Sequence, residues 1–225
     1  KIGIRTRPDG YCYGNHGHTQ QGWYDDEHWS SRGNTLRDPY PTFAQFCQAV
    51  QQRGCIPFTY FQVGMPANDF AAAHPDWMLN NDVSMLHQFH SHHMPLVSYD
   101  ATDKGFGEYM LTMWKRLRAD GIKGIKFDYP ETGWHPQGGF EDPYATALSA
   151  YRRYYELARE GLGPEAYLHE RLLGASETPL MEATLGLVDL QRVIGDSSHF
   201  EPEMVRRIGL RWYKNRVLYN YYPDS

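Results

Sequence analysis

The sequence has no long run of basic residues, no low-complexity segment and no extended apolar stretch. Its 225 residues include 22 Lys and Arg against 27 Asp and Glu, which gives a formal net charge of −5. Without a basic stripe the chain offers no electrostatic footprint for a phosphate backbone, so we expect no nucleic-acid partner. No apolar run approaches the ~20 residues of a membrane-spanning helix, so we expect no membrane span.

Cysteine is also scarce, with only Cys12, Cys47 and Cys55 and no CxxC pair. An odd number of distant cysteines argues against a disulfide framework and against a cysteine-based zinc site. The chain begins at Lys1 and shows no signal peptide, so we expect an excised or truncated part of a larger protein. These features leave the compartment unknown.

Aromatic residues, in contrast, are abundant at 15% of the chain, with 17 Tyr and 6 Trp. Aromatic rings fill protein cores, but they also line sugar clefts, because the C–H face of a sugar stacks on a ring. The composition therefore favours a carbohydrate site only weakly.

Short apolar strands alternate with helices or long loops along the whole chain. Helical spacing of apolar residues or end signals predict helices at 42–54, 104–119, 143–160 and 201–215. Strand patterns predict six or seven strands, at 1–5, 55–63, 95–100, 124–129, 166–171, within 185–197 and at 216–221. This alternation is typical of a parallel sheet covered on both faces, as in an α/β protein.

Acidic residues follow most of the predicted strands, at Asp100, Asp128, Glu170, Asp196 and Asp224. A doubly wound sheet needs polar residues only at its switch point, whereas all strand ends of a (β/α)₈ barrel meet at one mouth. We therefore prefer an α/β fold of the (β/α)₈ TIM-barrel type. It would form a single domain over residues 1–225 that lacks the eighth β/α unit.

The stretch "GIKGIKFDYPETGW", residues 121–134, ends a predicted strand with Lys126 and Asp128 on the same side. Such a pair is either a structural ion pair or a catalytic group with its cation. Across a barrel mouth, Asp128 and Asp196 could flank one bond, and glycoside hydrolysis needs two carboxyl groups in that arrangement. Lys126 would lower the pKa of Asp128 and keep it ionised.

Four phrases in one order resemble the α-galactosidase clan, glycoside hydrolase families 27 and 36. "GIKGIKFDY" resembles the fourth-strand motif with its Lys-x-Asp, and "LGLVDLQRVIGD" is similar to the sixth-strand motif with its Arg-x-x-Gly-Asp. "AAAHPDWML" resembles a second-loop phrase of family 36, and "LYNYYPDS" loosely resembles the seventh-strand phrase. The resemblance covers roughly residues 20–225.

The resemblance implies a retaining α-glycoside hydrolase, similar to an α-galactosidase or α-N-acetylgalactosaminidase, that cleaves a terminal α-linked sugar by double displacement. Its substrate would be an oligosaccharide or glycoconjugate, and it would need no cofactor or metal. It implies that Asp128 is the nucleophile and Asp196 the acid/base. The implied substrate-binding residues are Lys126, Arg192, Glu170 and Trp23.

One departure concerns the first strand, where the clan has two adjacent Asp that hold sugar hydroxyls. Here "QQGW" places Gln20 and Gln21 before Trp23, with Asp25 and Asp26 displaced downstream. The Arg that usually precedes the third strand is also not evident. The sequence therefore does not determine whether the sugar is galactose.

Self-association into a homo-oligomer is compatible with the sequence.

Rival interpretations remain open for the same residues. The nearest enzyme alternative is a family 31-like α-glucosidase or α-xylosidase, and a second is a catalytically silent carbohydrate-binding barrel. The histidine runs at 16–18 and 90–93 suggest a third alternative, a metal-dependent hydrolase. However, they lack an HExxH-like context. Asp196 could instead cap a helix, and Arg192 could pair with Asp196 or Glu170 and only stabilise the fold. Trp23, Trp77 or Trp134 could simply anchor loops.

Overall fold

The computed structural model describes fourteen stretches of the chain, most of them regular elements and the turns between them. They are residues 2–3, 18–19, 22–23, 43–61, 65–66, 69–79, 86–88, 95–97, 99–127, 133–171, 183–192, 202–210, 212–214 and 220–222.

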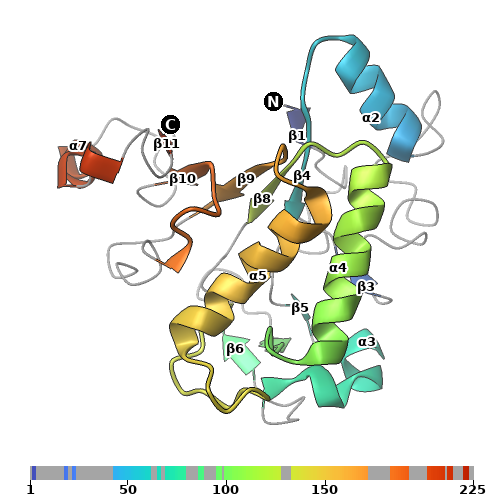
Figure 1. The fold of residues 1–225 in the computed structure, drawn as a ribbon, viewed down its shortest axis with the longest axis vertical. Helices are drawn as coiled ribbons and strands as arrows, with labels where there is room; N and C mark the ends of the chain where they lie inside the picture. The colour runs from blue at the N-terminus through green and yellow to red at the C-terminus, as the bar shows by residue number, and fades with distance from the viewer. Residues whose placement is uncertain are drawn as a thin grey trace.

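A six-stranded sheet forms the centre of the described structure, and all its strand pairs are parallel (Figure 1). Its strands, in spatial order, are β1 (Ile2–Gly3), β4 (Pro57–Phe61), β8 (Gly124–Phe127), β9 (Tyr167–Glu170), β10 (Leu190–Arg192) and β11 (Asn220–Tyr222). The spatial order of the strands is the same as their order in the sequence, as it is in a (β/α) barrel. The α/β parallel sheet is consistent with a partial barrel.

The prediction that residues 95–100 form a strand of this sheet is wrong. β7 (Pro95–Val97) is the middle strand of a separate antiparallel sheet with β5 (Met65–Pro66) and β6 (Leu86–Gln88). β4 instead pairs directly with β8. A short apolar run suits either kind of sheet, because its pattern does not encode its partner.

Asp100 accordingly belongs to a turn rather than to a barrel strand end. Its carboxylate accepts hydrogen bonds from the Thr102 amide at 2.8 Å, the Thr102 hydroxyl at 2.7 Å and the Glu141 amide at 2.5 Å. It thereby joins the start of the next helix to a distant loop.

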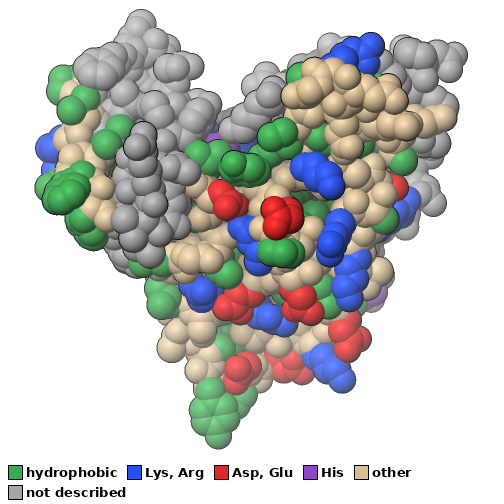
Figure 2. All heavy atoms as spheres, turned by 45° about the horizontal axis from the view of Figure 1, so that its top comes forward, with side chains coloured by type: hydrophobic (Ala, Val, Ile, Leu, Met, Phe, Trp, Pro, Cys, Tyr) green, Lys and Arg blue, Asp and Glu red, His purple; other side chains and the backbone are tan. Residues whose placement is uncertain are grey.

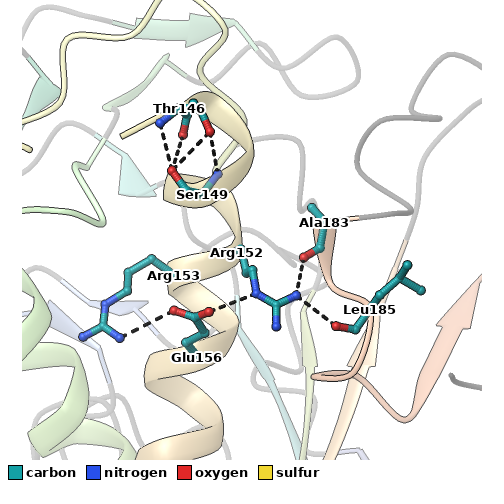
Figure 3. Close-up of polar contacts among 7 residues, drawn as sticks. All are labelled: Thr146, Ser149, Arg152, Arg153, Glu156, Ala183 and Leu185. Atoms are coloured by element: carbon teal, nitrogen blue, oxygen red, sulfur yellow. Dashed lines mark hydrogen bonds and ion pairs between the residues drawn. The ribbon is translucent and has the colours of Figure 1, made fainter. Parts of the chain in front are cut away.

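The longer helices lie close to their predicted positions. They are α2 (Phe43–Gln52), α4 (Lys104–Ala119), α5 (Ala147–Leu162) and α7 (Pro202–Leu210), with the short α3 (Asp69–Ala73) and the 3₁₀ turns η2 (Pro75–Trp77) and η5 (Trp212–Lys214). α5 begins later than predicted because Thr146 caps it: the Thr146 hydroxyl accepts from the Ser149 amide, and the Ser149 hydroxyl accepts from the Thr146 amide (Figure 3).

α4 and α5 pack side by side against one face of the sheet (Figure 1). Gly161 permits this close approach, since a Cβ atom there would lie 2.3 Å from Cβ of Trp114. Beneath the helices, the Phe61 ring lies 4.7 Å from that of Trp114, and the Phe127 ring lies 4.2 Å from that of Tyr155. Aromatic rings therefore fill the layer between helices and sheet.

Trp77 is a loop anchor, as one of the alternatives held. Its ring stacks on His74 at 3.8 Å and lies 5.9 Å from Phe70 and 5.5 Å from Tyr109 of α4. Trp134 likewise packs on α5, with its ring 6.0 Å from that of Tyr151. Both side chains join loops to the helix layer.

Acidic and basic side chains are interspersed over the face shown in Figure 2, without a broad area of one sign. No helix in the described part of the chain combines the length and the apolar character that crossing a membrane requires. Cys47 and Cys55 are free thiols, and burial raises the pKa of Cys47 to about 12. Cys12 lies outside the described residues.

Candidate active site

The two faces of the parallel sheet differ in what they contact. On β8, Ile125 and Phe127 belong to the buried core beneath α4 and α5. Because side chains alternate along a strand, Lys126 points to the opposite face, which we call the inner face. The inner face is where a barrel of this type encloses its interior.

Lys126 has a direct neighbour on β9, because its register partner is His169. Neighbouring strands lie ~4.8 Å apart, so their side chains stand next to each other on the inner face. Lys126 is half-buried, and His169 is fully buried. Two nitrogen donors are thus brought together in the middle of this face.

Arg192 also lies on the inner face, at the last residue of β10. The residue before it, Gln191, donates a hydrogen bond to Glu170 on the helix side, so Arg192 points the other way. Its side chain is only 1% exposed. The structure therefore places Lys126 and Arg192, the two cationic residues predicted from separate motifs, on the same face of the sheet, with β9 between their strands.

The opposite end of the inner face is apolar. Phe58, Gly124 and Tyr167 are register partners across β4, β8 and β9. The Phe58 ring lies over Gly124 and is 6.3 Å from that of Tyr167. The polar groups follow towards the carboxyl ends of the strands, which is the end where such sheets carry their chemistry.

Glu170, predicted to bind substrate, lies on the helix side of the sheet. Its carboxylate accepts hydrogen bonds from the hydroxyls of Tyr151 at 2.5 Å and Thr184 at 2.6 Å, and from the Gln191 amide at 2.5 Å. The side chain is fully buried. It joins α5 to β9 and β10, and we assign it a structural role in place of the expected one.

The charge state of Glu170 reflects two opposing influences. Burial penalises the ionised form and raises its pKa, whereas the hydrogen bonds from Thr184, Tyr151, Gln191 and Tyr155 lower it. Burial is the larger influence, so the pKa of Glu170 is raised.

The segment before β10 is held in place by arginines of α5. Arg152 donates from Nη1 to the carbonyl oxygens of Ala183 and Leu185, both at 2.9 Å, while its Nε binds Glu156 at 2.9 Å (Figure 3). These contacts position the turn that carries Thr184 to Glu170.

A second arginine fixes the start of β10. Arg159 pairs with the Asp189 carboxylate at 2.8 Å, and the same carboxylate oxygen accepts from the Leu168 amide at 2.9 Å. α5 therefore sets the relative positions of β9 and β10, and with them the inner-face residues.

The predicted catalytic residues Asp128 and Asp196 lie outside the described residues. Trp23 belongs to β3 (Gly22–Trp23), which pairs with β2 (His18–Thr19), but its side chain is also outside the description. Asp128 directly follows Phe127, the last residue of β8. The roles of these three residues remain predictions.

Sequence reasoning missed His169 and Arg171, which flank Glu170 and point away from the helices. The acidic residue in "AYLHER" drew attention, although the alternation of the strand gives its two neighbours the other face. The sequence does contain a signal for this. Leu168 is the apolar residue of the strand that belongs in the core, and because side chains alternate, His169 must point to the inner face.

Within the described ranges, no group of three or more His, Cys, Asp or Glu side chains is arranged to hold a metal ion. Most of the histidines at 16–18 and 90–93 fall outside those ranges.

Comparison with protein-family models finds no match, and comparison with curated protein sequences finds none. Among solved structures, the chain is similar to an α-galactosidase from Thermus thermophilus in complex with p-nitrophenyl α-D-galactopyranoside. The identity is 24% and the TM-score 0.56, over 76% of this chain and 34% of the other. A family 27 β-L-arabinopyranosidase from Geobacillus stearothermophilus matches with 13% identity and a TM-score of 0.53, over 82% of this chain and 41% of the other.

The chain thus spans about a third to two fifths of the length of these solved structures. Both neighbours are TIM-barrel glycoside hydrolases. At these identities the likeness shows a shared fold.

Proposed function

We propose that the chain is the catalytic barrel of a retaining α-glycoside hydrolase that cleaves a terminal α-linked sugar. Asp128 is the nucleophile and Asp196 the acid/base. Lys126, Arg192 and Trp23 bind the substrate. Residues 1–225 belong to one (β/α)₈-type domain.

The observation that carries the proposal is that Lys126 of β8 and Arg192 of β10 share the inner face of the sheet, with β9 between their strands. Asp128 follows Lys126 by two residues, and Asp196 follows Arg192 by four. Each predicted carboxylate thus comes from a segment that leaves the carboxyl end of a strand, where barrel enzymes carry their chemistry. The fold shared with an α-galactosidase supports the same conclusion.

Double displacement describes the reaction. Asp128 attacks the anomeric carbon while the bond to the leaving oxygen breaks, and that oxygen takes the proton of Asp196. Water then attacks the same carbon, Asp196 removes its proton, and the ester bond to Asp128 breaks. Lys126 favours the ionised form of Asp128, which a nucleophile requires.

The sugar belongs to the galactose type, by resemblance to the clan, but is substituted or differently configured. Gln20 and Gln21 stand where the clan has two Asp, and amides donate as well as accept hydrogen bonds. We therefore expect weak turnover of a plain α-galactoside.

A panel of nitrophenyl α-glycosides tests the proposal on the full-length protein. It includes α-galactoside, α-N-acetylgalactosaminide, α-glucoside and α-xyloside, with Asp128→Asn as the inactive control. Turnover confined to the glucoside or xyloside would indicate a family 31-like enzyme. Binding of sugars without any turnover would indicate a silent barrel, and loss of activity with EDTA would indicate a metal-dependent hydrolase.

A further inference from the structure

Strand β9 turns its acidic residue towards the helices and its two basic neighbours away from them. Glu170 is hydrogen-bonded to Tyr151 of α5, which fixes its direction. The amide of Arg171 donates to the carbonyl oxygen of Phe127 at 3.0 Å, so the pairing with β8 continues through Arg171. Alternation along the strand therefore places His169 and Arg171 together on the inner face.

Arg171 stands beside Arg192. The register between β9 and β10 pairs His169 with Leu190 and Glu170 with Gln191, and one further step sets Arg171 next to Arg192. Both point to the inner face, with exposed fractions of 5% and 1%. Neighbouring strands of a sheet lie ~4.8 Å apart, so two side chains in this arrangement can reach one ligand. Lys126 and His169 form the preceding pair on the inner face, closer to the amino ends of the strands.

Two adjacent guanidinium groups suit a ligand rich in oxygen. Each guanidinium carries five N–H donors in a rigid plane, so an arginine that contacts the protein still has donors to offer to a ligand. Two neighbouring oxygens on a ligand match this geometry. In a sugar they come either from a carboxylate or from two adjacent hydroxyls.

We propose that Arg171, supported by His169, is the substrate-binding contribution of β9, and that Arg171 and Arg192 together bind two adjacent oxygens of the sugar. The identity of the ligand as a sugar rests on the proposed function. The placement of Arg171 rests on the strand register alone.

The test compares four forms of the full-length protein: wild type, Arg171→Lys, Arg171→Gln and the matched control Arg153→Lys. The control makes the same substitution at a partly exposed arginine of α5 that pairs with Glu156. KM and kcat are measured on the best nitrophenyl glycoside. The Kd values of galactose and galacturonic acid are measured by calorimetry, and circular dichroism verifies folding.

We expect Arg171→Lys to raise KM and the sugar Kd about 10-fold or more, as the loss of charge-assisted hydrogen bonds does. Arg153→Lys should leave both constants unchanged. A larger loss for galacturonic acid than for galactose would identify the bound oxygens as a carboxylate. Equal losses would identify them as hydroxyls.

Unchanged KM and Kd in a folded Arg171→Lys protein would overturn the inference while wild-type turnover leaves the proposed function intact. Failure of both Arg171 variants to fold would identify a structural arginine and would also overturn it. If wild type binds a sugar without cleaving any substrate, the hydrolase proposal fails, and the Kd comparison still decides the role of Arg171. Absence of any sugar binding by wild type overturns both.

Discussion

The hydroxyl of Tyr151 on α5 donates a 2.5 Å hydrogen bond to the buried carboxylate of Glu170 on β9. The Tyr155 hydroxyl lies 2.8 Å from that of Tyr151 and extends the chain of hydrogen bonds. This link ties the helix layer to the strand whose other face carries His169 and Arg171. It has consequences for stability that can be measured apart from activity.

Tyr151→Phe should destabilise the fold by about 1–3 kcal/mol, because a buried acceptor loses its donor. Urea unfolding followed by circular dichroism measures the change. Tyr144→Phe is the matched control, since Tyr144 is 91% exposed, and it should stay within about 0.5 kcal/mol of wild type. Equal effects of the two substitutions would show that the buried hydrogen bond contributes little.

Glu170→Gln should reduce the dependence of stability on pH. Burial raises the pKa of Glu170 above its usual value of 4.5, so the folded state binds the proton more tightly than the unfolded state. The associated stabilisation is present below the unfolded pKa and is lost as pH rises through the folded pKa. Glutamine does not titrate, so the unfolding free energy of wild type should fall relative to the variant across that window.

Unfolding in urea at a series of pH values between 4 and 8 provides the measurement for Glu170. Other titrating groups are common to both proteins and cancel in the difference. A difference in unfolding free energy that stays constant over the series would show that Glu170 titrates as it does in the unfolded chain.

Gly124→Ala should destabilise the protein by about 1–3 kcal/mol through overpacking. A Cβ atom at Gly124 would lie 2.2 Å from the Phe58 ring, which is itself buried. Gly209→Ala on α7 is the control, because an added Cβ there meets nothing within 4 Å. Removing a helical glycine at an open position should raise stability by up to about 1 kcal/mol. A Gly124→Ala protein as stable as wild type would mean that the Phe58 ring can move aside.

Asp128→Asn should abolish turnover of every substrate, because the attack on the anomeric carbon requires this carboxylate. Asp196→Ala should instead depend on the leaving group. A nitrophenolate departs with little protonation, whereas the alkoxide of a natural sugar needs an acid catalyst. Steady-state rates on an activated and a natural substrate separate the two roles.

The second step gives an independent check on Asp196. Without its base, attack by water should slow, so the covalent intermediate accumulates and a burst appears. Azide needs no general base and should restore turnover. Equal loss on both substrates with no azide effect would identify Asp196 as a helix cap, and Asp224, Asp25 and Glu131 would become the candidate acids.

The stereochemistry of the first product tests the retaining mechanism. Double displacement at an α-glycoside inverts the anomeric carbon twice, so the first sugar released should be the α-anomer. Proton NMR early in the reaction distinguishes the anomers before mutarotation. An initial β-anomer would contradict the assignment of Asp128 as a nucleophile.

Local sequence patterns determined the helices and most of the strands. The apolar stripe of residues 104–119 predicted α4 in full, because helical periodicity is written into a single segment. The alternation on β8 likewise predicted that Ile125 and Phe127 point to one face of the strand and Lys126 to the other. The motifs around Lys126 and Arg192 predicted two strands of one sheet with a single strand between them, and the sheet order has β9 between β8 and β10.

The tertiary structure decided which strands pair and which face is the inner one. Residues 95–97 pair in an antiparallel sheet because strand partners are chosen by long-range contacts that a short apolar run does not specify. Glu170 was predicted at the mouth, but the position of Tyr151 on α5 directs it into the helix layer. Alternation within "LHER" could say only that Glu170 and Arg171 face opposite ways. The packing of α5 decided that the arginine, and not the glutamate, lies beside Arg192, because one face of β9 must receive the helix and its hydroxyl donors.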